Sequence, residues 1–346
     1  MMKRNFITKT ICFFIIISII SMLFCTYSTN ANTFNIEDIN LSDDISEQDA
    51  KVESKIENME EKIIKYDATT GETTEIDLEE LESKINLLNA IGNENLSNST
   101  KGYDPYSSKY LDNNDGTITP NALEDYFFTK VYDTSVYPYR DTCRLIIDGG
   151  MAYGSGYLVG PNVMLTAAHC VYNSEKDNEP RQFIVYPGYN NGSYKGYSSG
   201  WQAIYRSSIW LETHNKEYDW ALVELKEDLG NKVGWYGTVN YYSNSSLKDV
   251  PVKSLGYPAD FDLGKCQYYT MGKINNVYTR DFTTTVGNKG GMSGGPIIIN
   301  DSNNEKNEYA VGIVQGNKAN SPLDQTHGVR LNDYLINLIR DYINKY

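Results

Sequence analysis

The chain has 346 residues, an apolar fraction of 40% and a formal net charge of −14. This composition can bury a core, and it excludes a polytopic membrane protein, a collagen-like chain and a wholly disordered one. The acidic balance also argues against nucleic acid as a general partner. Residues 1–31 carry three bases and no acid, residues 32–120 carry 21 acids and 7 bases, and residues 121–346 carry 24 acids and 21 bases. The sequence therefore predicts a basic leader, an acidic middle segment and a nearly neutral body.

The leader has the pattern of a secretory signal peptide. Lys3, Arg4 and Lys9 precede an apolar run from Ile11 to Cys25. Positive charge followed by a short apolar stretch is typical of such peptides, so residues 1–31 are predicted to be removed on secretion. A membrane anchor is the alternative, but the run is shorter than the roughly 20 residues that span a bilayer. The mature protein is then predicted to be extracellular, with no stable membrane association.

The acidic segment, residues 32–120, allows two interpretations. Apolar residues at Val52, Ile56, Met59 and Ile63 predict an amphipathic helix within residues 46–67, and residues 77–88 predict a second one. The interpretation that needs no specific function is a solvated, partly disordered linker. The alternative is a propeptide, which depends on what the body is.

Cysteine and histidine usage limits the chemistry of the mature chain. Cys12 and Cys25 lie in the leader, which leaves Cys143, Cys170 and Cys266. Because three is an odd number, at least one thiol is unpaired or pairs with another molecule. The chain has three His and no Cys/His spacing typical of a zinc site, so we expect no metal and no cofactor.

The body, residues 121–346, reads as many short strands. Apolar and aromatic runs bounded by turn residues lie at 143–147, 156–159, 163–166, 183–186, 220–225 and 297–299. Such a pattern predicts an all-β barrel or sandwich. Helical spacing of apolar residues over 331–343 predicts a C-terminal amphipathic helix.

Three local motifs carry candidate catalytic residues. The string Thr-Ala-Ala-His-Cys contains His169 directly after a predicted strand. Asp219 stands at the entry to another strand that reads as buried, where a carboxylate needs a partner. Ser293 lies within Gly-Gly-Met-Ser-Gly-Gly-Pro, and glycines on both sides allow the backbone to bend and to approach a ligand closely.

These residue types belong together chemically. A serine hydroxyl such as that of Ser293 is a weak nucleophile and needs a base, for which the intrinsic pKa of a histidine such as His169 is suitable. An acceptor such as Asp219 would hold the imidazole in the correct tautomer and stabilise its cation. The backbone N–H groups of Gly291 and Ser293 are the natural donors for an oxyanion.

The chain order His, Asp, Ser and the three motifs resemble the chymotrypsin-like serine proteases. Within that family the chain is most similar to the bacterial glutamyl endopeptidases, through the strings Tyr137–Arg140, Val185–Gly188 and Leu255–Pro258. The resemblance covers roughly residues 121–346.

The resemblance implies two antiparallel six-stranded β-barrels followed by a C-terminal α-helix. Residues 121–240 would form the first barrel and carry His169 and Asp219, and residues 241–346 would form the second and carry Ser293. The boundary is expected between Gly234 and Leu247. Because family members are made as inactive precursors, residues 32–120 are then expected to be a propeptide, partly helical or disordered, with the mature chain starting near Asn121.

Two departures from the family pattern bear on activation and on disulfides. Met292 precedes the nucleophile where the animal digestive enzymes carry an Asp that pairs with the new N-terminus, so that switch is absent; the glutamyl branch also lacks it. Gly154 stands where family members place the Cys that pairs with Cys170. We therefore expect Cys170 to be a free, buried thiol.

The predicted substrate pocket rests on the resemblance alone. Gly287 stands where trypsin-like enzymes carry an acid, which argues against cleavage after Lys or Arg. Glutamyl endopeptidases use a Ser or Thr and a His at two positions that correspond here to Asn288 and Val314, so the specificity His is missing. Arg330 matches a pocket-lining position and could bind an acidic side chain, although it could equally be a surface charge.

The strand formed by Val314, Gln315 and Gly316 is expected to pair with the substrate backbone. Together these positions predict a secreted serine endopeptidase, made as a zymogen and acting as a monomer on proteins or peptides, with a preference for Glu or Asp before the cut bond. The alternatives are a non-catalytic secreted binding module on the same fold and a toxin-like protease of narrow specificity.

Overall fold

The computed structural model describes most of the chain. The described residues are 52–76, 99–106, 128–173, 179–192, 194–240, 244–300, 308–317 and 326–343. The chain divides into two units, Met1–Lys55 and Ile56–Tyr346, and apart from the helical residues 52–55 everything below concerns the second.

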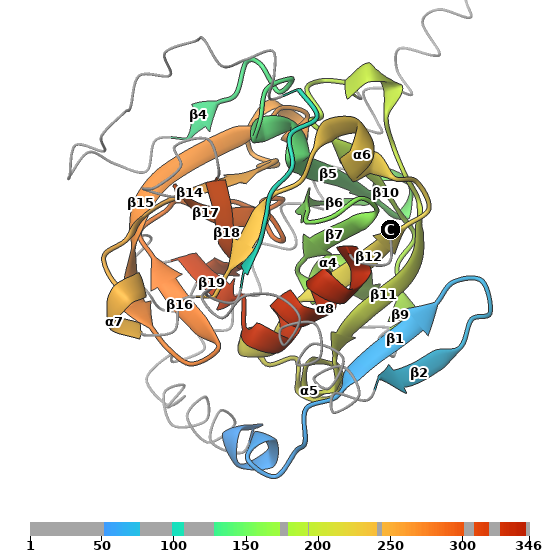
Figure 1. The fold of residues 1–346 in the computed structure, drawn as a ribbon, viewed down its shortest axis with the longest axis vertical. Coiled ribbons are helices and arrows are strands. Elements are labelled where there is room, and N and C mark those ends of the chain that lie inside the picture. The colour runs from blue at the N-terminus through green and yellow to red at the C-terminus, as the bar shows by residue number, and fades with distance from the viewer. Residues whose placement is uncertain are drawn as a thin grey trace, which may run out of the picture. The chain divides into compact units, whose positions relative to one another are not determined.

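Six antiparallel strands form the first barrel, drawn in green and yellow-green in Figure 1. They are β5 (Thr142–Ile147), β6 (Ala152–Leu158), β7 (Val163–Thr166), β10 (Phe183–Pro187), β11 (Trp201–Ser207) and β12 (Ala221–Leu225), joined in the order β10-β5-β6-β7-β12-β11. The ring closes where Val185 and Ser199 exchange two backbone hydrogen bonds of 2.8 and 3.0 Å. Closure leaves the inward-facing apolar side chains, such as Leu145 and Leu165, fully buried.

Six further strands form the second barrel, drawn in orange and red in Figure 1. They are β14 (Pro251–Gly256), β15 (Tyr268–Val277), β16 (Asp281–Thr284), β17 (Pro296–Asn300), β18 (Glu308–Asn317) and β19 (Thr326–Arg330). The pairing runs β14-β15-β16-β19-β18-β17, and β17 returns to β14. The predicted pair of six-stranded antiparallel barrels is therefore confirmed.

Short elements connect the strands. The helices are α4 (Ala168–Val171), α5 (Ser208–Thr213), α6 (Leu229–Val233), α7 (Asn244–Leu247) and α8 (Asp333–Ile343), and the short strands include β4 (Thr129–Lys130), β8 (Tyr172–Asn173), β9 (Glu179–Pro180) and β13 (Gly237–Val239). The 3₁₀ turns are η2 (Tyr139–Asp141), η3 (Asp148–Gly150), η4 (Tyr194–Gly196), η5 (Lys216–Tyr218) and η6 (Asp262–Gly264). The predicted C-terminal helix is confirmed as α8, whose Leu335 and Ile339 are fully buried. Among the helices described, none is both long and apolar enough to cross a membrane.

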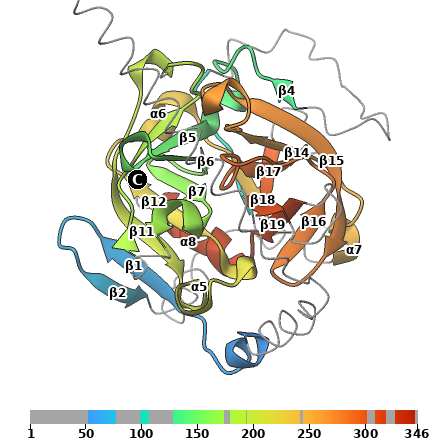
Figure 2. The same cartoon turned by 180° about the vertical axis from the view of Figure 1, so that it is seen from behind.

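The acidic segment contributes strands to both sheets. β1 (Ile63–Asp67) pairs with β11 and with β2 (Thr73–Ile76), so this hairpin extends the first sheet, as both Figure 1 and Figure 2 show in blue. β3 (Ser99–Thr100) pairs with β13. The helix predicted over residues 46–67 is therefore wrong at its C-terminal end: residues 52–56 are helical, but 63–67 form a strand because the edge of β11 offers hydrogen bonds and buries Ile63. The second predicted helix, at 77–88, lies outside the described residues.

Cys143, Cys170 and Cys266 are all free and buried, which confirms the prediction for Cys170. A Cβ atom on Gly154 would lie 3.1 Å from the Cys170 sulfur. Gly154 is therefore at the position from which a cysteine would reach Cys170, and its replacement by glycine explains the free thiol.

Candidate active site

His169 comes from the first barrel. The strand β7 ends at Thr166, and α4 begins at Ala168, so His169 lies in the first turn of this short helix. Its side chain is 39% exposed, whereas the Asp219 side chain beside it is 2% exposed. One edge of the imidazole thus contacts the buried Asp219 carboxylate, and the rest of the ring remains accessible to solvent.

Asp219 follows η5 and precedes β12, and its carboxylate accepts three hydrogen bonds. Oδ1 accepts from the backbone N–H of His169 at 2.9 Å, and Oδ2 lies 2.6 Å from His169 Nδ1. The Gln315 side-chain amide donates to Oδ2 at 3.1 Å. Burial alone raises the pKa of Asp219, but the His169 charge and these hydrogen bonds hold it below its usual value. An ionised carboxylate only accepts, so Nδ1 of His169 carries the proton.

Ser293 lies in the loop between β16 and β17, which the second barrel presents toward His169. The amide of Gly294 donates to the Val314 carbonyl at 2.7 Å, which ties this loop to β18. The Ser293 hydroxyl donates to the Gln315 carbonyl at 3.4 Å. Gln315 therefore contacts Ser293 through its backbone and Asp219 through its side chain. Among the described residues no hydrogen bond joins Ser293 to His169; such bonds are often long before substrate binds.

Backbone amides beside Ser293 are arranged as a candidate oxyanion site. Gly291 has φ +94°, and a Cβ there would lie 2.4 Å from the Tyr257 carbonyl, so only glycine fits this peptide orientation. The amides of Met292 and Gly294 donate to other backbone carbonyls. Within the described part of the chain, the amides of Gly291 and Ser293 have no such acceptor. They are therefore available to a negatively charged oxygen.

A cavity of about 510 Å³ opens beside the histidine. Its lining joins the two barrels: His169, Trp210, His214, Lys216 and Asp219 come from the first, and Gln315 and Gly316 from the second. Gln315 and Gly316 were predicted here from the sequence, whereas Trp210, His214 and Lys216 were not. Their signal was their place in the chain, a few residues before Asp219. Val314 is fully buried in the core of the second barrel and does not line this cavity.

Two predicted pocket residues, Arg330 and Asn288, do not line the cavity beside His169. The guanidinium of Arg330, which is 7% exposed, donates to Asn244 Oδ1 at 2.8 Å and to the Tyr278 carbonyl at 3.1 Å. Asn244 and Tyr278 line a different cavity, so Arg330 is committed there and not to the cavity of His169. Asn288 is half-buried, and its buried Oδ1 has no hydrogen-bond partner within the described ranges.

Ser155 of β6 is a further residue of the site that sequence reasoning missed. Its hydroxyl donates to the Gly291 carbonyl at 2.7 Å and accepts from the Tyr257 amide at 3.0 Å, while its own amide donates to the Ser293 carbonyl at 2.9 Å. Ser155 is fully buried, so these contacts fasten the Ser293 loop to the first barrel. A lone serine within the strand Ala152–Leu158 was the available signal.

The pKa of His169 predicts the pH dependence of any hydrolysis at this site. Burial alone lowers this pKa, but the Asp219 carboxylate and the Cys170 side chain together outweigh burial, and the pKa of His169 lies well above its usual 6.5. A general base must be neutral, so kcat/KM is expected to rise with pH and to reach half its plateau above pH 6.5. Substrates without titratable groups make the profile report the enzyme. A rise centred at or below pH 6.5 would contradict this electrostatic account.

Metal ligands do not gather in this region. The described residues include no group of three or more His, Cys, Asp or Glu side chains that could hold a metal ion.

The sequence of this chain is similar to those of known peptidases. Residues 154–306 match the family model described as a trypsin-like peptidase domain. An extracellular metalloprotease of Bacillus subtilis is 30% identical over 223 residues, which cover 63% of this chain and 68% of that protein. A glutamyl endopeptidase of Bacillus licheniformis is 32% identical over 170 residues, which cover 49% of this chain and 52% of that protein, so the match spans about half of this second relative.

A solved structure gives the same result at the level of the fold. The structure of a Glu endopeptidase in complex with MPD matches with a TM-score of 0.55 and 26% identity, covering 64% of this chain and 99% of that one. The part of this chain that is matched thus corresponds to the whole of that structure. The chain therefore belongs to the trypsin-like serine peptidase family, in its glutamyl endopeptidase branch.

Proposed function

We propose that this protein is a secreted serine endopeptidase in which Ser293 is the nucleophile, His169 the general base and Asp219 the residue that orients the base. The observation that carries the proposal is the hydrogen-bonded pair of His169 and buried Asp219, connected to Ser293 through Gln315. Family membership supports the same reaction class. The backbone amides of Gly291 and Ser293, which have no acceptor in the described structure, also support the proposal.

Acylation would begin at the Ser293 hydroxyl. As Oγ bonds to the scissile carbonyl carbon, Nε2 of His169 takes the hydroxyl proton, and the carbonyl π electrons move to oxygen. Asp219 stabilises the imidazolium that forms. The amides of Gly291 and Ser293 donate to the oxyanion, and because they are already positioned they need no reorganisation.

Collapse of this intermediate would break the peptide bond. His169 returns its proton to the leaving amine, which departs and leaves an acyl group on Ser293. A water molecule then attacks the ester, and His169 accepts its proton. As the bond to Ser293 Oγ breaks, His169 returns this proton to Oγ, and the released carboxylic acid ionises in water. The half-exposed position of His169 is compatible with entry of that water.

The proposal includes how the protein is made. Residues 1–31 would be a signal peptide, residues 32–120 a propeptide, and the mature extracellular body would begin near Asn121 and act as a monomer on protein or peptide substrates. The supports are the charge distribution along the chain and the extracellular relative of Bacillus subtilis.

For specificity we propose a preference for Glu or Asp before the cut bond. The relatives named glutamyl endopeptidase support it, as do His214 and Lys216, two basic residues in the lining of the cavity beside His169. Gly287 leaves no acid at the position where trypsin-like enzymes attract Lys or Arg. Arg330 has no part in this proposal, because Asn244 and the Tyr278 carbonyl already bind its guanidinium.

Cleavage profiling on a peptide library tests this specificity. Wild-type enzyme is expected to cut after acidic residues more often than after apolar or basic ones. Lys216→Gln is expected to reduce the ratio of kcat/KM for acidic over apolar peptides about threefold, a size typical of an exposed charge. Lys248→Gln is the matched control, because Lys248 lines the other cavity. The proposed specificity would be contradicted if Lys216→Gln and Lys248→Gln gave equal ratios of kcat/KM for acidic over apolar peptides. A wild-type preference for basic residues would contradict it too.

A further inference from the structure

Residues 99–106 of the acidic segment are built into the surface of the body, as the teal stretch in Figure 1 shows. β3 pairs with β13, where the hydroxyls of Thr100 and Thr238 share a buried hydrogen bond of 2.8 Å. Tyr103 and Trp235 exchange two backbone hydrogen bonds of 2.9 Å each, and their rings lie 4.5 Å apart. We call residues 99–106 the docked segment.

The body surface is shaped to receive this backbone. Gly234 has φ +113°, and a Cβ there would lie 2.4 Å from the Tyr103 carbonyl. A Cβ on Gly102 would lie 2.8 Å from the amide of Gly237. Glycine on each side of the contact permits an approach that no other residue would allow. The fit is therefore a property of both partners.

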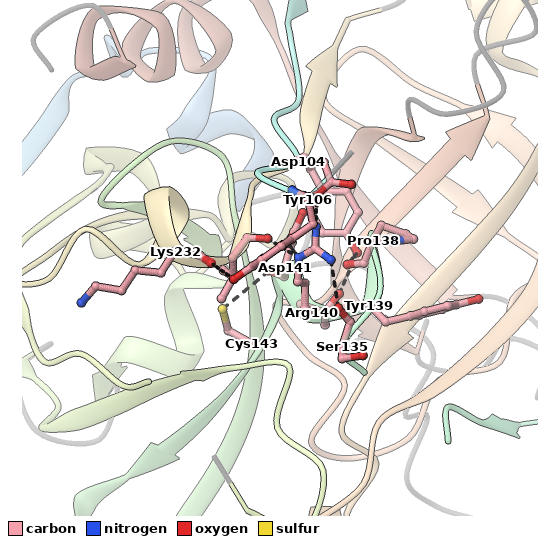
Figure 3. Close-up of polar contacts among 12 residues, drawn as sticks. Asp104, Tyr106, Ser135, Pro138, Tyr139, Arg140, Asp141, Cys143 and Lys232 are labelled. Atoms are coloured by element: carbon pink, nitrogen blue, oxygen red, sulfur yellow. Dashed lines mark hydrogen bonds and ion pairs between the residues drawn. The ribbon is translucent and has the colours of Figure 1, made fainter. Parts of the chain in front are cut away.

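Asp104 of the docked segment supplies the hydrogen-bonded carboxylate of a buried arginine, shown in Figure 3. Arg140 is fully buried and forms an ion pair and hydrogen bond with Asp104. The Tyr106 ring lies over the guanidinium at 4.8 Å. The remaining contacts of Arg140 are the carbonyls of Val233 and Ser135 and, at 3.9 Å, an oxygen of Asp141.

Loss of the docked segment would therefore expose a specific defect. Arg140 would lose both its hydrogen-bonded carboxylate and the Tyr106 ring that covers it. Taking one partner from a buried, hydrogen-bonded charge pair is strongly unfavourable, because the other charge remains poorly solvated. The body thus has a physical reason to keep the segment bound.

The position of the docked segment also leaves the candidate active site open. All the residues that line the cavity beside His169 fall between positions 169 and 316. The hairpin of β1 and β2 likewise docks on β11, through the fully buried Ile63. Neither contact needs to be released for substrate to reach His169.

We propose that the part of the acidic segment from residue 56 to residue 106 remains bound to the body after the connecting chain is cut, as the smaller chain of a two-chain protein, anchored chiefly by Asp104 on Arg140. This inference rests on the maturation step of the proposed function. It differs from simple removal of a propeptide, since the cut would separate the chains covalently without releasing the fragment.

The test uses the full chain carrying Ser293→Ala and a recognition sequence for a specific protease inserted within residues 107–127. After cutting, native size-exclusion chromatography of the diluted protein and mass spectrometry of the peak identify the chains present. We expect the fragment to elute with the body. Separate elution of the fragment overturns the proposal. Because the variant lacks the proposed nucleophile, the readout is binding, and a failure of the hydrolytic assignment would be seen only in activity assays.

Asp104→Asn tests the anchor, with Glu72→Gln in the exposed turn of the same fragment as its matched control. We expect the dissociation constant of the fragment to rise at least about tenfold for Asp104→Asn and to stay unchanged for Glu72→Gln. Equal constants in the two variants overturn the role of Asp104. If Asp104→Asn fails to fold, hydrogen exchange is measured on the cut protein that keeps Asp104. The amides of Tyr103 and Trp235 stay protected if the fragment is retained. They exchange freely if the fragment is lost, which overturns the proposal.

Discussion

Ser293→Ala is expected to abolish peptide hydrolysis, with a loss on the order of 10⁶-fold in kcat, as in other triad enzymes. The reason is that, among the residues that the structure describes, no other hydroxyl or thiol takes the place of Ser293 beside the amides of residues 291 and 293 and the His169–Asp219 pair. Cys170 is close by, but its thiol is directed to the Ser293 carbonyl at 3.5 Å and is buried. The measurement is kcat on a peptide substrate that the library profiling identifies.

The control for this prediction is Ser246→Ala, which changes an exposed serine of α7 in the second barrel. It should retain wild-type kcat, which shows that loss of a serine hydroxyl as such has no effect. Circular dichroism establishes that both variants fold. Hydrolysis by Ser293→Ala at the wild-type rate would show that another residue is the nucleophile, or that the activity belongs to a different site.

Asp219→Asn is expected to reduce kcat on the order of 10⁴-fold while the fold is retained, the size seen when this substitution is made in related triads. The carboxylate accepts from His169 Nδ1, whereas an asparagine amide can donate to that nitrogen instead. The neutral imidazole would then carry its proton on Nε2, the atom that must accept from Ser293. The imidazolium would also lose its buried counter-charge.

The chain offers a close control for this effect. Asp281 and His327 form a second aspartate–histidine pair, with 3.0 Å between Oδ2 and Nδ1, and neither residue lines the cavity beside His169. Asp281→Asn removes the same kind of contact and should leave kcat within a few-fold of wild type. Equal losses in the two variants would mean that Asp219 acts through the stability of the barrels and not through His169.

The residues that local strings specify were predictable from the sequence. His169, Asp219 and Ser293 each stand in a short motif whose chemistry can be argued from its neighbours, and the strands of both barrels follow apolar runs between turn residues. The free thiol of Cys170 was predictable too, because Gly154 was identified as the position of its missing partner.

The contacts that depend on tertiary structure were not predictable. Gln315 binds Asp219 across 96 positions of sequence, and nothing in its local string indicates this. Arg330 matched a pocket-lining position, yet the fold brings Asn244 and Tyr278 to its guanidinium. The strand at 63–67 has apolar spacing that also suits a helix, and only the free edge of β11 selects the strand.

The docked segment shows the same limit more strongly. Acidic composition suggested a solvated, partly disordered linker or a propeptide, and nothing in the sequence indicated a partner for Asp104. The partner is Arg140, which the family-like string Tyr137–Arg140 contains but whose burial depends on both barrels being folded. Composition therefore predicted the charge of the segment correctly but not its contacts.

The central claim is that Ser293 is an activated nucleophile, and covalent labelling tests it most directly. When the mature protein reacts with an organophosphorus fluoridate, the Ser293 oxygen bonds to phosphorus, fluoride leaves the reagent and His169 takes the hydroxyl proton. Peptide mass spectrometry then locates the adduct. The account predicts one adduct, on Ser293, that appears together with loss of hydrolysis and that Asp219→Asn strongly slows. Active protein that remains unlabelled, or that carries its adduct on another residue, would contradict it.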